Sequence, residues 1–139
     1  MNDMQKYDKE IADLKVAIDT DPENARAYHS LGVVYAKQGK LDLAVASYQA
    51  AININPDHTQ TYYNLGNAYG RQAKLDLAIK SFKQAISIKP DNAKAYRNLG
   101  VTYAKQGKSD LAVASFKKAI SIKPELDNPS LRRRINPQL

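Results

Sequence analysis

Four prolines, at positions 22, 56, 90 and 124, stand 34 residues apart, and the sequence between them nearly repeats. The stretch SLGVVYAKQGKLDLAVASYQAAI in residues 25–58 returns as NLGNAYGRQAKLDLAIKSFKQAI in residues 59–92 and as NLGVTYAKQGKSDLAVASFKKAI in residues 93–126. A fixed period of this length is typical of solenoids built from stacked helical hairpins. The period therefore predicts an all-α fold, and it directs the search for function to a surface groove rather than to a buried catalytic pocket.

Each repeat carries the signature of two helices joined by a tight turn. The first helix presents the stripe Tyr-x2-Leu-Gly-x2-Tyr, beginning at Tyr28, Tyr62 and Tyr96, and the second presents Ala-x3-Tyr/Phe-x2-Ala. Apolar residues at this spacing lie on one helix face. A glycine on that face costs about 1 kcal/mol of helix propensity, so we expect another backbone to approach it closely. The turns fall at 38–40, 72–74 and 106–108, and the proline ends the second helix.

This pattern resembles the tetratricopeptide repeat (TPR) family over residues 25–126. The usual first-position Trp of that family is Tyr in all three copies, and Ala73 replaces the turn glycine of the second. The resemblance implies a right-handed superhelical solenoid of antiparallel helix hairpins. It also implies a protein interaction scaffold with neither catalytic residues nor a cofactor.

The repeats divide the chain into five expected units: a partial repeat or capping helix at 1–24, complete repeats at 25–58, 59–92 and 93–126, and a short cap or tail at 127–139. Residues 7–20 match a second helix without its first. One helix before Pro22 and two in each repeat predict at least seven helices, and Pro129 is placed to open a further short helix that Pro137 ends. Because this last helix is so short, we expect helix 110–122 to be poorly covered.

Composition excludes several classes of function. The chain has no cysteine, and two histidines alone cannot fill a structural zinc site. No nucleophile–base set or phosphate-binding loop is apparent, so we expect no enzyme, no metal and no cofactor. No stretch is apolar enough for a membrane span or a signal peptide, which predicts a cytoplasmic protein.

Charge is distributed unevenly along the chain. Residues 1–23 hold seven acidic residues and three lysines, a net charge of −4, whereas residues 24–139 carry a net charge of +11. Such asymmetry favours an acidic partner, a nucleic acid or association of opposite ends of the array.

The first helices carry the candidate binding surface, because in TPR proteins the side opposite the packing stripe lines a concave groove. The groove positions are Arg26, His29, Lys37, Gln60, Tyr63, Asn64, Asn67, Arg71, Lys94, Arg97, Asn98 and Lys105. Six of these residues are basic, and the three first helices contain no Asp or Glu. Asn64 and Asn98 can each donate a hydrogen bond to a peptide backbone and accept one from it. Their positions partly resemble the asparagine ladder of the TPR region of O-GlcNAc transferases.

These residues predict a scaffold that binds an extended acidic or carboxylate-bearing peptide. We expect Arg71, Lys94 and Arg97 to converge near the centre of the groove, with Asn64 and Asn98 beside them. Two alternatives stay open: self-assembly through the array ends, and single-stranded RNA binding on the basic groove with Tyr63 as a stacking platform. The run Arg132–Arg134 is short, which disfavours nucleic acid.

Overall fold

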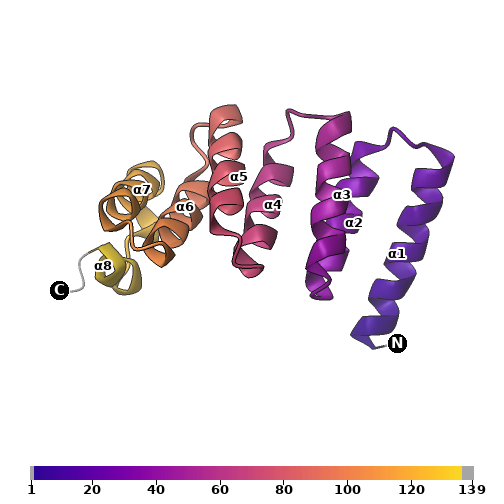
Figure 1. Cartoon of the computed structure of the whole chain (residues 1–139), viewed down its shortest axis with the longest axis horizontal. Coiled ribbons are helices and arrows are strands. Elements are labelled where there is room, and N and C mark those ends of the chain that lie inside the picture. The colour runs from indigo at the N-terminus through magenta and orange to yellow at the C-terminus, as the bar shows by residue number, and fades with distance from the viewer. Residues whose placement is uncertain (1, 136–139) are drawn as a thin grey trace.

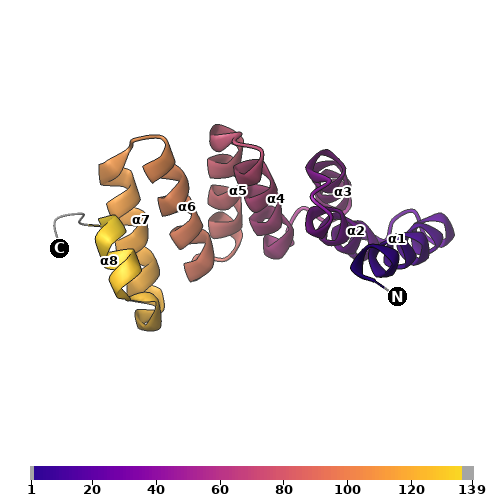
Figure 2. The ribbon, with the colours of Figure 1, turned by 90° about the horizontal axis from the view of Figure 1, so that it is seen from below.

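The computed structural model describes residues 2–135 as a row of packed helices (Figure 1). The helices are α1 (Asp3–Thr20), α2 (Ala25–Lys37), α3 (Leu41–Ile54), α4 (Thr59–Arg71), α5 (Leu75–Ile88), α6 (Ala93–Lys105), α7 (Ser109–Ile122) and α8 (Pro129–Ile135), with a 3-10 turn at Pro124–Leu126. No strand occurs in the described range, so the predicted all-α class is confirmed. The helix axes turn along the row. The helix α3 is seen from the side in Figure 1 and end-on in Figure 2, whereas α7 is seen end-on in Figure 1 and from the side in Figure 2.

The helices pair as antiparallel hairpins, α2 with α3, α4 with α5 and α6 with α7. Each turn between partners holds one residue in the left-handed region: Gly39 at φ 75°, Ala73 at φ 58° and Gly107 at φ 77°. The three turns share one backbone pattern, in which the following lysine N–H donates to the carbonyl of the last stripe tyrosine at 2.9 Å. Ala73 therefore keeps the turn geometry despite its Cβ.

Aromatic side chains of the second helices pack on the glycines of the first. A Cβ added at Gly32, Gly66 or Gly100 would lie 2.5–2.7 Å from a ring carbon of Tyr48, Phe82 or Phe116, respectively. We expected a neighbouring backbone at these glycines, and the structure instead places an aromatic ring there. These rings are almost completely buried and form the centre of the core.

A glutamine–aspartate ladder joins successive hairpins. Gln38, Gln72 and Gln106, at the ends of the first helices, donate through Nε2 to Asp8, Asp42 and Asp76 of the preceding second helices at 3.2, 2.5 and 2.6 Å. Asp8 thus stands one period before Asp42, so α1 takes the place of a second helix and packs on α2 as α3 packs on α4. This helix begins at Asp3, four residues earlier than the sequence pattern indicates.

The C-terminal helix α8 covers α7 more fully than we expected. Leu131 of α8 is 4% exposed, and Phe116 and Ala119 of α7 are as buried as their counterparts in the inner repeats. Asn128 caps the helix by accepting from the Leu131 N–H at 2.9 Å. The expectation of a poorly covered last helix is therefore wrong. Pro137, expected to end α8, lies outside the described residues.

Within residues 2–135, no helix combines the length and the apolar character that a membrane span requires.

Candidate functional site

The first-helix face, formed by the twelve groove residues of α2, α4 and α6, is accessible to solvent. Each of the twelve is at least partly exposed, and none belongs to the core. A hollow of about 230 Å³ lies between α2 and α4 and includes Lys37, Asn64 and Arg71. A second hollow of about 440 Å³ lies between α4 and α6 and includes Asn98 and Lys105.

The structure separates the basic residues of this face into two groups. Lys37, Arg71 and Lys105 are the last residues of α2, α4 and α6, whereas Lys94 and Arg97 lie in the first two turns of α6. Within the repeat, Arg71 stands eight positions beyond Arg97 and eleven beyond Lys94. At 1.5 Å per residue, this offset is about 12–16 Å along the helix axis. Arg71, Lys94 and Arg97 therefore do not converge, contrary to the expectation from sequence.

At the turn end of the face, Arg71 also links two repeats. Its Nη1 donates to the Ala36 carbonyl at 2.9 Å, so its positive charge lies at the C-terminal end of α2. That end carries a partial negative charge, which the guanidinium stabilises. Tyr48 lines the same hollow, and burial raises the pKa of its hydroxyl to about 12 despite the opposing charge of Arg71. The Tyr48 hydroxyl therefore stays neutral at physiological pH.

Side-chain amides occupy the middle of the face. Asn98 Nδ2 donates to Asn67 Oδ1 at 2.8 Å and to the Tyr63 hydroxyl at 3.1 Å, which joins α6 to α4. Asn64 instead accepts from Gln60 of its own helix at 3.1 Å. Asn64 and Asn98 are thus not paired with each other, and the amide connection between repeats runs through Asn67. Among the described residues, the Asn98 Oδ1 has no hydrogen-bond partner and can accept from a peptide N–H.

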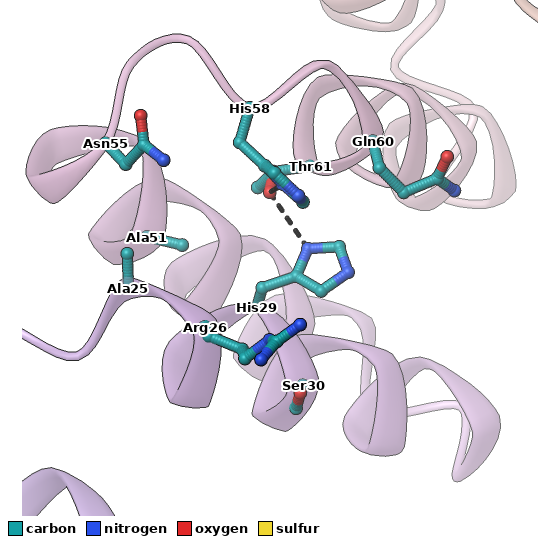
Figure 3. Close-up of a pocket in the computed structure, with 9 residues that line it drawn as sticks. All are labelled: Ala25, Arg26, His29, Ser30, Ala51, Asn55, His58, Gln60 and Thr61. Carbon is teal, nitrogen blue, oxygen red and sulfur yellow. Dashed lines mark hydrogen bonds between the residues drawn. The ribbon is translucent and has the colours of Figure 1, made fainter.

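At the start of the face, His29 of α2 and His58, which directly precedes α4, meet in a pocket of about 510 Å³ between these two helices, here named the histidine pocket (Figure 3). His29 Nδ1 and His58 Nδ1 lie 2.9 and 2.6 Å from the same Thr61 Oγ1. The imidazole rings stand edge to face, with their centroids 5.1 Å apart. Burial first, and the nearby His58 second, hold the pKa of His29 below its ordinary value.

Sequence reasoning missed three residues that the structure adds to this face. His58 and Thr61 line the histidine pocket, and Arg134 of α8 lines a hollow of about 380 Å³ with Arg97. The period gives no signal for the histidines, because neither has a counterpart at its position in another repeat. No set of three or more His, Asp or Glu side chains in residues 2–135 is arranged to hold a metal ion.

Stacked hairpins that carry an exposed polar face define a helical-repeat protein that presents a binding surface to other macromolecules. The family model described as tetratricopeptide repeat matches residues 23–91 and 60–125, and a second model, described as TPR repeat, matches residues 2–39. Because these matches span most of the chain, the chain belongs to the tetratricopeptide repeat family. Proteins of this family are generally non-catalytic interaction scaffolds.

Solved structures of MamA are similar to the whole array. Two crystal structures of MamA share 28% sequence identity with the chain, with TM-scores of 0.88 and 0.87; each match covers 95% of this chain and 76% or 71% of the other. A third, titled "MamA MSR-1 C2", shares 29% identity with a TM-score of 0.77 and covers 88% and 70% of the two chains. Curated protein sequences contain no match to the chain. The family and these structural neighbours together support a protein–protein interaction scaffold.

Proposed function

We propose that this protein is a non-catalytic scaffold that holds an extended, acidic or carboxylate-bearing segment of a partner protein along the first-helix face. The observation that carries the proposal is uncompensated positive charge. The salt bridges within residues 2–135 join Lys9 to Asp13 and Arg132 to Asp127, so none involves a basic residue of this face. The three helices that form the face contain no carboxylate, and a partner would therefore supply the negative charge.

The amide cluster favours a peptide over single-stranded RNA. RNA would need Tyr63 as a stacking platform. The Tyr63 ring instead packs against the Phe82 ring, with the two centroids 6.0 Å apart, and its hydroxyl accepts a hydrogen bond from Asn98, so the ring is already engaged within the protein. Asn67 and Asn98 instead offer donors and acceptors that match a peptide backbone. The small residues Ala36 and Gly70 border the hollows and leave space for an extended main chain.

The test uses a fluorescently labelled, N-acetylated peptide in which Glu alternates with Ser, and the same peptide with Gln in place of Glu. We expect the acidic peptide to bind and the neutral one to bind at least tenfold more weakly, as measured by fluorescence anisotropy. Lys94→Glu with Arg97→Glu should weaken the acidic peptide at least tenfold, because each reversal replaces an attraction by a repulsion.

The matched control carries the same change in net charge on the second helices. Lys80→Glu with Lys117→Glu alters two exposed lysines of α5 and α7 and should change the affinity by less than about threefold at 0.15 M salt, where charges more than about 8 Å apart are screened. Equal losses in both double variants would show that net charge, and not the first-helix face, determines binding.

Self-assembly is the second candidate function. On α1, Met4 is 52% exposed and Val16 is 64% exposed, so packing on α2 leaves two large apolar side chains uncovered. The segment that contains α1 is acidic, whereas the rest of the chain is basic. If the N-terminal end of one copy packed against the basic region of another, the contact would cover the two apolar side chains and bring opposite charges together.

A further inference from the structure

The histidine pocket contains a hydrogen-bond arrangement whose donor count depends on protonation. The Thr61 hydroxyl has one proton, so with both imidazoles neutral it donates to one Nδ1 and accepts from the Nδ1–H of the other. One ring then carries a bare Nε2 acceptor. When both rings are protonated, both Nδ1–H groups donate to the two lone pairs of Thr61 Oγ1, and both Nε2–H groups become donors for a ligand.

The surroundings of the pocket are cationic or neutral. The titratable groups that face His29 are Arg26 on α2, one turn earlier, Tyr48 on α3, with its ring centroid at 5.8 Å, and His58 before α4. Asp57 adjoins His58 in sequence but does not line the pocket. No carboxylate of residues 2–135 lines it, so a protonated histidine here has no internal counter-ion.

The pocket is also large enough for a side chain of a partner. Its volume of about 510 Å³ lies at the start of the first-helix face, and Ser30 and Gln60 border it on α2 and α4. Figure 3 shows Arg26 and His29 extending from the same side of α2, with the second nitrogen of His29 directed away from Thr61. An anion in this position could meet the guanidinium and an imidazolium N–H together.

We propose that the histidine pocket is a carboxylate subsite for an acidic side chain of the bound peptide, in which Arg26 supplies a permanent positive charge and protonated imidazole makes the subsite stronger as the pH falls from 8 to 6. The inference rests on the proposed function, since it assumes a peptide on the first-helix face. Burial and the neighbouring His58 hold the pKa of His29 below its ordinary value in the free protein, and a bound carboxylate would offset both effects. Binding and proton uptake are therefore coupled, and each promotes the other.

The experiment measures the affinity of the acidic Glu/Ser peptide at pH 6.0 and pH 8.0, at constant ionic strength. We expect about tenfold tighter binding at pH 6.0, because one or two neutral contacts become charge-assisted. His29→Asn with His58→Asn should abolish the pH dependence, so that the ratio of the affinities at pH 6.0 and pH 8.0 falls to about one. Circular dichroism of the same samples confirms that the double variant is folded.

A second variant separates charge from titration. Arg26→Gln removes the permanent charge and retains both histidines, so it should weaken binding at both pH values by a similar factor and leave the pH dependence intact. The site itself is observed by NMR of the imidazole nitrogens: saturating acidic peptide should raise the titration midpoint of His29, and the Gln-containing peptide should not.

The outcomes distinguish the subsite from the function. Binding that is equally tight at both pH values, with an unmoved His29 midpoint, overturns the subsite and leaves the groove proposal standing. If the acidic peptide binds at neither pH 6.0 nor pH 8.0, both the peptide-binding function and the subsite are overturned. A single-stranded oligouridylate that binds more tightly than the peptide, with the same dependence on the two histidines, would assign the pocket to phosphate and overturn the carboxylate.

Discussion

Gly66 on α4 lies directly beneath the ring of Phe82 on α5, and a Cβ built on Gly66 would stand 2.6 Å from Phe82 Cε1. Because the ring is 2% exposed and held on all sides, it cannot move away from an added side chain. We expect Gly66→Leu to destabilise the protein by more than about 2 kcal/mol, since overpacking would force α4 and α5 apart.

The chain provides a control for this change within the same helix. Gly70 has no atom within 4 Å of its added Cβ, so Gly70→Ala should be neutral or stabilise α4 by up to about 1 kcal/mol through helix propensity. Urea unfolding reports both effects as changes in midpoint. A Gly66→Leu midpoint equal to that of the unmodified protein would contradict the tight contact.

Ala73 is a site where glycine should increase stability. Its φ of 58° is costly for a residue with a Cβ, by about 1–2 kcal/mol, and the unfolded-state entropy of glycine offsets about half of that gain. We expect Ala73→Gly to stabilise by about 0.5–1 kcal/mol and the mirror change Gly39→Ala to destabilise by a similar amount. Thermal unfolding followed by circular dichroism measures both, and shifts of the same sign in the two variants would refute the backbone explanation.

Tyr48 should make the protein sensitive to alkali. Burial raises the pKa of its hydroxyl from 10.0 to about 12, so the folded state favours the neutral phenol. The stability this contributes is complete below pH 10 and is lost as the pH rises from 10 to 12. Tyr48→Phe imitates Phe82 and Phe116 at the equivalent positions and should reduce that loss, as urea midpoints at pH 8 and pH 11 would show. An unchanged alkaline loss would place its origin in other tyrosines.

Asn98 should contribute to peptide affinity without contributing charge. Asn98→Ala removes the amide that joins Asn67 and Tyr63, together with an acceptor for the peptide backbone. We expect the acidic peptide to bind about three- to tenfold more weakly. The slope of log affinity against log salt should match that of the unmodified protein, whereas Arg97→Gln should make it shallower. A changed slope in Asn98→Ala would indicate a rearranged face.

Self-association should depend on both apolar surface and charge. Sedimentation velocity at rising protein concentration and low salt should show a dimer that 0.5 M salt weakens. Met4→Glu with Val16→Lys leaves the net charge unchanged and should shift the equilibrium toward monomer. A monomer at every concentration and salt level would exclude this mode of assembly.

The 34-residue period was sufficient to predict the helix pairs, their turns and their proline-limited ends, because these depend on which residues share a helix face and on local backbone chemistry. The packing stripes were also predictable, since Leu31, Leu65 and Leu99 each stand at helical spacing from the tyrosines of their own stripe, and all three are buried. The packing of the Phe82 ring on Gly66 was not predictable, because helical periodicity identifies the face of a helix that packs but not the group that contacts it.

Relations between repeats were decided by the tertiary structure alone. Sequence reasoning placed the basic residues on one face of the array. The expectation that Arg71 and Lys94 converge overlooked their positions in the repeat, since Arg71 is the last residue of α4 and Lys94 lies in the first turn of α6. The packing of α4 beside α2 brings His29 to the Thr61 hydroxyl across 32 residues of sequence, where His58 also contacts it. Local periodicity carries no information about such contacts, because they arise from the rigid stacking of one hairpin on the next.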